Sequence, residues 1–476
     1  MDLQRHLVAV ALIVVTFTSS ASGQNGGGGG GNGNGGFPGG ILISPNGLVN
    51  RVNSVAVNAA ALRQLRNHAL KALNEDLNQP SDRRFVSLAG LDEAIARQLA
   101  ANESLSADMK FLAGLSRIDF VIVEEHDVIL AGPASGFASS PDGRIISVES
   151  GRPVLNLDDL LVALRGASEE NHVGCSMDPD IQRLQQAMDW LKANSAPATP
   201  ADARARMQRS VELQGEWTVS TFGVPETSRM CLAMVEADYL MKRIAIGSEN
   251  PGVRGLRSSL ALARPNDNMM RRWWFTPCYT LDRTEDARVF AFSGPRLQLH
   301  GREELINDAG QVIEANLIQP SSEKFARLFS DRIDQLAEKV PAFADLQNIF
   351  DLLTAGAILN EAESSGRLNW TLRTLRDQQS LSIASYSVPR TTLPEVNTKD
   401  AGSLIIGAFS GGVTIRPANL TASASLKGTS KANLQDTEVS DRRRDQDLNW
   451  PTMDVVRQHA KSDAGWWDAM SADAVK

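Results

Sequence analysis

The stretch MRRWWFTPCYT, residues 270–280, decides the fold, because it is typical of a strand that carries large side chains on both faces. Alternation along a strand separates two sets of side chains, Arg271, Trp273, Phe275 and Tyr279 on one face and Arg272, Trp274, Thr276 and Cys278 on the other. Each face carries a tryptophan, so we expect both faces to be covered. The tryptophans then belong to the core, and the arginines pair or stack at its rim.

The same stretch has a second interpretation as a ligand-binding surface. In that case Trp273 and Trp274 form an aromatic platform for a glycan or peptide, and Arg271 is a further candidate ligand-binding residue. An exposed, coplanar aromatic pair is the signature that would favour the platform over the core.

The segments that follow predict the layer around this strand. Residues 289–292 and 296–300 resemble two more strands joined by Ser293-Gly294-Pro295, which predicts an antiparallel meander of three strands. Residues 321–340 and 341–359 have apolar side chains at helical spacing and predict a helical layer over the meander. We therefore expect an α+β fold, with an antiparallel sheet packed against amphipathic helices.

The N-terminal part of the body mixes both element types. We predict a hairpin around Pro45-Asn46-Gly47, because Asn-Gly favours the positive φ of a tight turn. Helices are expected over residues 55–77, 91–99 and 106–115, and two strands around Glu125-His126-Asp127. Short strands return over residues 381–388 and within residues 401–417. His126, at the tip of a hairpin, is interpreted as a solvated turn residue.

Cys175 is the candidate catalytic residue of the chain. Asp178-Pro179 is a typical N-cap and first-turn pair, so Cys175 would precede a helix whose dipole lowers the pKa of its thiol. His172, three residues upstream, is the candidate base. The alternative is a buried structural cysteine, since free cysteine is among the most often buried residue types.

A stripe of methionines, Met230, Met234 and Met241, repeats at helical spacing in SRMCLAMVEADYLMKRIAIG. Such a stripe can line an adaptable apolar site, but methionine more often fills gaps in a core. We interpret it as core.

The two ends of the chain predict its organisation. A polar start, an apolar run over residues 7–17 and small residues up to Gly23 are typical of a secretory signal peptide cut before Gln24, too short for a transmembrane anchor. We predict five regions: 1–23 signal peptide, 24–40 flexible Gly-rich linker, 41–200 N-terminal α+β region, 201–420 main α+β region, and 421–476 largely disordered polar tail. Trp450, Trp466 and Trp467 in that tail could dock on the body or on a partner.

Composition limits the classes of function. A net charge of −8 and a pI near 5.4 give no electrostatic reason to bind nucleic acid. Three cysteines, Cys175, Cys231 and Cys278, are too few for a disulfide scaffold. The sequence has no HExxH, GxSxG, P-loop or paired CxxC motif, and its six histidines are scattered. We therefore predict no metal site and no cofactor.

Five motifs in order resemble a known family, namely CSMDPDIQRLQQ, EADYLMKRIAIG, RRWWFTPCY, PAFADLQNIFDLLTAGAIL and GGVTIRP. They are similar to a domain of unknown function carried by exported planctomycete proteins, number fifteen-ninety-eight in that series. The resemblance extends over about residues 41–420. It implies a bacterial envelope setting, periplasmic or extracellular, and brings no catalytic or binding residue with it.

Three hypotheses remain open from the sequence. The first is an exported, non-catalytic envelope protein that has a structural role or binds a protein or glycan component. The second is a hydrolase or thiol enzyme in which a cleft brings Cys175 or Cys278 to His172 or His300. The third is a carbohydrate-binding module that uses surface tryptophans.

Overall fold

The computed structural model describes most of the chain beyond residue 40. The described ranges are 41–43, 47–51, 59–73, 75–140, 142–166, 172–194, 199–264, 267, 270–306, 312–314, 319–369, 372–394, 396–400, 404–426 and 465–470. The predicted signal peptide, the Gly-rich linker and most of the polar tail lie outside these residues.

Thirteen of the described strands belong to one mixed sheet. Its main path runs in the order β13 (Thr391–Thr392), β9 (Trp217–Phe222), β8 (Val173–Asp178), β15 (Leu404–Ile415), β10 (Met270–Arg283), β11 (Val289–Ile306), β4 (Phe120–Val123), β5 (Val128–Ala134), β3 (Ser81–Ser87) and β17 (Trp467–Met470). Three further strands each pair with one strand of this path: β12 (Val312–Glu314) with β11, β14 (Val396–Asp400) with β15 and β16 (Ser425–Leu426) with β10. The sheet thus joins strands from both sides of residue 200.

Two separate hairpins and the helices complete the fold. The hairpins are β1 (Ile41–Ile43) with β2 (Val49–Arg51) and β6 (Phe137–Ser139) with β7 (Ile145–Ser147). The longer helices are α1 (Ala59–Ala72), α3 (Leu88–Ala100), α5 (Leu157–Gly166), α6 (Ile181–Ala193), α7 (Pro200–Gln214), α8 (Arg229–Ile246), α10 (Pro320–Ser330), α11 (Ile333–Lys339) and α12 (Pro341–Ser364). The shorter ones are α2 (Glu75–Asn78), α4 (Ala107–Lys110), η1 (Leu112–Gly114), α9 (Ser259–Leu262), α13 (Arg373–Arg376) and α14 (Pro417–Ala422). The predicted α+β class is confirmed.

The segment predicted as three strands is a two-stranded hairpin. β10 and β11 pair antiparallel from Arg271 opposite Glu303 to Arg283 opposite Phe290, with a bulge between Cys278 and Thr280. Gly294 and Arg296 have φ of 87° and 64° at this point, so the Ser-Gly-Pro segment bends β11 instead of ending it. The other neighbour of β10 is β15, which pairs with it in parallel.

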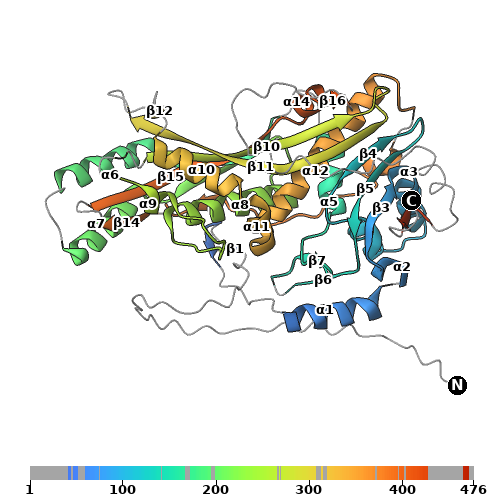
Figure 1. Cartoon of the computed structure of the whole chain (residues 1–476), viewed down its shortest axis with the longest axis horizontal. Coiled ribbons are helices and arrows are strands. Elements are labelled where there is room, and N and C mark those ends of the chain that lie inside the picture. Colours follow the sequence, from blue (N-terminus) through green and yellow to red (C-terminus); the bar gives the residue numbers. More distant parts are fainter. Residues whose placement is uncertain are drawn as a thin grey trace. The chain divides into compact units, whose positions relative to one another are not determined.

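Helices α8, α10 and α12 cover one face of this hairpin and of β15 (Figure 1). Trp273 meets the ring of Phe325 on α10 at 4.8 Å between centroids, and Phe275 meets Phe329 and Phe343. α12 is long and apolar enough to cross a membrane, but its apolar window is completely buried within the protein. It is the central helix of the core, and the methionine stripe of α8 is buried beside it, as predicted.

Three predicted elements differ from the structure. α6 begins at Ile181 with Asp180 as its N-cap, so Asp178 is the last residue of β8 and not a cap. Residues 381–388 are irregular, and the next strand is β13. The helix predicted over residues 106–115 is a single α-turn, α4, followed by the 3-10 turn η1.

The last described segment lies against the body. β17 pairs antiparallel with β3, and Trp466, just before it, is 8% exposed. The guanidinium of Arg84 lies 4.9 Å from the centroid of the Trp467 ring. Of the two alternatives for Trp466 and Trp467, the structure shows docking on the body, while Trp450 lies outside the described residues.

Candidate functional site

The candidate site is the face of the sheet that is turned away from α8, α10 and α12. We define the Trp274 face by the half-buried or exposed side chains of four strands, Ser176 and Asp178 on β8, Thr218 and Ser220 on β9, Arg272, Trp274 and Thr276 on β10, and Gln298, His300 and Arg302 on β11. The register places them in rows. Trp274 lies opposite His300 on one side and Gly412 on the other, and the row continues through Ser176 to Ser220.

Two side chains of β11 lie beside the Trp274 ring. Its indole is nearly parallel to the imidazole of His300, with 5.7 Å between centroids and 21° between planes. The guanidinium of Arg302 lies 5.6 Å from the centroid of the indole, which is a cation–π distance. His300 also hydrogen-bonds through Nε2 to the Thr276 hydroxyl at 2.9 Å. The aromatic pair is therefore held in a defined orientation on a half-exposed surface.

Polar side chains surround the aromatic pair. Arg272 donates to Asp178 at 2.7 Å, and both side chains remain about 40% exposed, at 38% and 41%. Burial, and secondarily the positive charge of Arg302, lower the pKa of His300. His300 is thus neutral at pH 7, and it can donate or accept a hydrogen bond without a charge.

The opposite face of β10 is core, which settles the position of two predicted ligand residues. Trp273 is 0% exposed, and its ring crosses Gly301 on β11, where an added Cβ would come within 2.3 Å of the ring. Trp273 is therefore not part of a surface platform. The alternation predicted for β10 is correct up to the bulge, but only one of its two faces is fully covered.

Arg271 is buried, and its prediction as a rim residue is wrong. It is 1% exposed and donates to Ser321 at 2.8 Å, to Gln319 at 3.1 Å and to Ser259. Its Nε lies 3.7 Å from the carboxylate of Glu303, which is the register partner of Arg271 on β11. The side chain follows Trp273 into the core because the two share a face, and partners from α9 and α10 satisfy its donors.

The structure separates Cys175 from His172. Cys175 points into the apolar core and is 2% exposed, whereas His172 is exposed and hydrogen-bonds to the Thr414 hydroxyl on the outer side. Residues three apart on a strand project from opposite faces. Burial raises the pKa of the Cys175 thiol well above its usual range, so the expectation of a lowered pKa is wrong. The pair does not form a nucleophile and base.

The other two cysteines do not take the role of nucleophile that was predicted for Cys175. Cys231 is buried in α8, and burial raises the pKa of its thiol. Cys278 is half-buried on β10, four residues from Trp274, which is roughly 13 Å of strand. The row of Cys278 is therefore well separated from that of His300. The geometry therefore pairs neither Cys175 with His172 nor Cys278 with His300.

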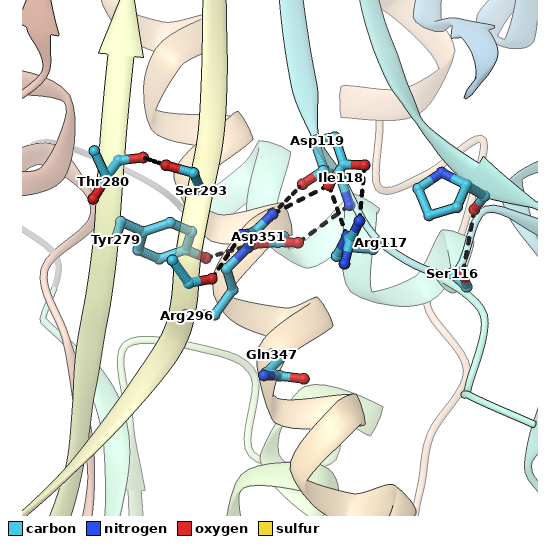
Figure 2. A network of polar contacts seen from close by, with 12 residues as sticks. Ser116, Arg117, Ile118, Asp119, Tyr279, Thr280, Ser293, Arg296, Gln347 and Asp351 are labelled. Atoms are coloured by element: carbon cyan, nitrogen blue, oxygen red, sulfur yellow. Dashed lines mark hydrogen bonds and ion pairs between the residues drawn. The ribbon is translucent and has the colours of Figure 1, made fainter. Parts of the chain in front are cut away.

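A buried network holds α12 to the sheet (Figure 2). Asp351 is 0% exposed, and its carboxylate accepts from the Tyr279 hydroxyl at 2.7 Å, from the Ile118 amide at 3.1 Å and from Arg296 Nε at 3.2 Å. Arg296 also donates to the Ile118 carbonyl at 2.9 Å. Burial raises the pKa of Asp351 and of Tyr279. Partners from β10, β11 and the segment before β4 surround the carboxylate, as expected for a structural cross-link.

A second buried cluster ties α5, α8 and α12 to the segment between β6 and β7. Arg144 contacts Glu236 and Asp345, and Arg229 contacts Asp345 and Asp159. With Asp142, which also contacts Arg144, four carboxylates share two guanidiniums. Burial, and the charge of neighbouring Asp345, raise the pKa of Asp159 to about 6 even though Arg229 lowers it. Among the described residues, no group of three His, Cys, Asp or Glu side chains is arranged to hold a metal ion.

Sequence reasoning missed the partner of Trp274. The platform interpretation grouped Trp274 with Trp273, its neighbour in the chain, while the aromatic side chain beside it belongs to His300 on the next strand. The register of the β10–β11 hairpin would have identified His300 as the partner. That register was not predictable, because β11 was predicted as two strands and the bulge shifts the pairing.

Comparison with known proteins gives one match. A family model described as a protein of unknown function, DUF1598, matches residues 175–259, from β8 to the start of α9. This range holds two of the five motifs, CSMDPDIQRLQQ and EADYLMKRIAIG. No curated protein and no solved structure matches the chain. A domain of unknown function is therefore supported for this part of the chain. The matched residues include β8 and β9, two strands of the Trp274 face.

Proposed function

We propose that the chain is an exported, non-catalytic binding protein of the bacterial envelope, and that its Trp274 face binds a polysaccharide. The export part rests on the signal-peptide pattern of residues 1–23 and the periplasmic or extracellular setting implied by the resemblance to exported planctomycete proteins. The binding part rests on the geometry of the sheet. The partner is thus an envelope glycan rather than nucleic acid, metal or cofactor.

The observation that carries the proposal is the orientation of Trp274. Its indole is stacked near His300 and beside Arg302 on a half-exposed sheet face, while its neighbour Trp273 is completely buried. A core tryptophan needs no such outer partners. Aromatic rings that keep an apolar face at a polar surface are enriched where proteins bind ligands.

The surrounding residues fit the chemistry of a sugar. A pyranose ring has an apolar C–H face that packs on an aromatic ring, and hydroxyls at its edge that both donate and accept hydrogen bonds. Ser176, Ser220, Thr276 and Gln298 supply neutral donors and acceptors around Trp274, and the Arg272–Asp178 pair supplies one of each in charged form. A row of side chains across several strands suits a chain of sugars better than a small molecule, which needs a concave pocket.

Retention on insoluble polysaccharides tests this proposal. The mature chain is mixed with suspensions of peptidoglycan sacculi, chitin or cellulose and sedimented, and the bound fraction is measured. Trp190→Ala is the matched control, because Trp190 is also half-buried but lies on α6. We expect retention on at least one polymer, a loss of about tenfold or more in affinity for Trp274→Ala, and no change for Trp190→Ala. Lack of retention on all polymers, or equal loss in both variants, would contradict the proposal.

A further inference from the structure

The edge of the sheet at β3 is closed by the C-terminal strand. β3 pairs on its inner side with β5 and on its outer side with β17, in the register Trp467 opposite Val86 to Met470 opposite Arg83. Without β17, β3 would present a row of unpaired backbone groups, which is a template for another strand. This edge is separate from the Trp274 face.

Trp466 packs against the end of β3 and the start of α3, and we call this site the Trp466 seat. Its carbonyl accepts a hydrogen bond from the Ser87 amide at 2.9 Å, and its side chain is 8% exposed. A Cβ placed on Gly90 would lie 2.8 Å from the Trp466 Cβ. Gly90 therefore leaves the room that the tryptophan fills, on the first turn of a helix capped by Ser87.

Trp467 meets a group that the body holds in position. The Arg84 guanidinium lies 4.9 Å from the Trp467 ring centroid, which is a cation–π distance. Arg84 also donates to the carbonyls of Ala113 at 2.5 Å and Gln79 at 2.9 Å. These bonds come from outside β17, so they can orient Arg84 whether or not the strand is in place.

A long stretch of sequence joins β17 to the preceding described part of the chain. Residues 427–464, which separate β16 from Gly465, number 38. At ~3.5 Å per extended residue they can span at most roughly 130 Å. A connection of this length is long enough for the strand to reach β3 of a second copy.

We infer that β3, with its Trp466 seat, is an acceptor for the tryptophan strand of a second copy of this chain. The intrachain strand closes the acceptor when copies are dilute, and strands exchange between copies as the concentration of the chain rises. The second copy is the partner because every copy carries the one segment whose two tryptophans match Gly90 and Arg84 in this register. Recognition is by β-strand addition, with the backbone supplying affinity and the two rings specificity.

Peptide binding to the full chain tests this inference. The probe is a fluorescein-labelled peptide of residues 464–472, followed by polarisation. The receptors are the native chain, a Trp466→Ala/Trp467→Ala chain whose own strand is disabled, and the same chain with Gly90→Val added. We expect the peptide to bind the disabled chain at least tenfold more tightly than the native chain, and the Gly90→Val change to abolish binding. A peptide with both tryptophans replaced by alanine is the control and should not bind.

Three outcomes would overturn the inference. The first is no binding to the disabled chain, and the second is equal binding to the native and disabled chains, which would place the peptide elsewhere. The third concerns folding, checked by circular dichroism. Asp468→Pro is a second way to disable the strand. Trp466 bonds to β3 through its backbone, and every second residue of an antiparallel strand does so, which includes Asp468. Proline at this position removes the amide donor. If both disabled chains fail to fold, the strand is an inseparable part of the body and does not exchange.

Discussion

At the scale of single residues, two adjacent tryptophans have opposite roles because a strand alternates its side chains. Trp273 packs under Phe325 and over Gly301, while Trp274 lies beside His300 on the half-exposed face. This alternation was predictable from the sequence. The burial of Arg271 was not, because its partners Ser259, Gln319 and Ser321 are distant in the chain and none of them is a motif.

The two tryptophans should therefore differ in their effect on stability. Trp273→Ala removes a completely buried ring and leaves a cavity, so we expect a loss of ~3 to 5 kcal/mol in the free energy of unfolding. Trp274→Ala removes a half-buried ring and should cost less than about half as much. Denaturant unfolding measures both. Equal losses would show that Trp274 is a core residue and would remove the basis of the binding surface.

Arg271→Ala should also be strongly destabilising. It leaves the carboxylate of Glu303, which is 2% exposed, without the guanidinium at 3.7 Å, and breaking a buried pair of this kind costs ~3 to 5 kcal/mol. Arg272→Ala is the control, because the Arg272–Asp178 pair is partly exposed and should contribute ~1 kcal/mol or less. The same denaturant curves measure both changes. A loss for Arg271→Ala as small as that for Arg272→Ala would show that Arg271 lies at the rim of the core.

At the scale of elements, the long helices were predicted well and the long strands less so. Apolar spacing is a local property, and it identified the start of α12 at Pro341. The helix predicted over residues 321–340 is two helices, α10 and α11, which are separated at Asp331 and Arg332. β11 was predicted as two strands because Gly294-Pro295 resembles a turn, whereas the structure uses it as a bulge that aims Arg296 at Asp351. A bulge and a turn have the same local composition, and only the partner strand distinguishes them.

The attachment of α12 through Asp351 can be measured directly. Asp351→Ala removes the acceptor of Tyr279, Arg296 and the Ile118 amide and leaves Arg296 buried with less counter-charge. We expect a loss of ~3 to 5 kcal/mol in the free energy of unfolding. Glu338→Ala on neighbouring α11, where the side chain is exposed, should change it by ~0.5 kcal/mol or less. Similar small losses in both variants would mean that the network is not a cross-link.

At the scale of the whole molecule, the features that define the sheet connect distant parts of the chain. β10 pairs in parallel with β15, and β3 pairs with β17 near the other end of the sequence. Nothing in one sequence specifies such pairings, so the Trp274 face, which spans β8 to β11, could not be assembled from its motifs. The buried charge clusters have the same origin, because the sequence shows each acid and each arginine but not which of them pair.

The cluster around Asp159 should make stability depend on pH. The folded-state pKa of Asp159 is raised to about 6, against ~3.9 in the unfolded chain. The folded state therefore binds this proton more tightly, so the contribution to stability is present below about pH 4 and is lost as pH rises through about 6. We expect the native free energy of unfolding to fall by on the order of 3 kcal/mol over this window relative to Asp159→Asn. Parallel curves for the two proteins would show that Asp159 keeps its usual pKa.

The most direct test of the account is a hydroxyl-radical footprint of the tryptophans with and without the polysaccharide that retains the chain. Mass spectrometry reports the oxidation of Trp273, Trp274 and Trp190 separately in one sample. We predict that Trp273 is not oxidised in either state, and that Trp274 and Trp190 are both oxidised in the free chain. With the polysaccharide bound, Trp274 should become protected while Trp190 does not change. Oxidation of Trp274 that is equal in both states, with protection elsewhere on the chain, would contradict the assignment of the Trp274 face as the binding surface.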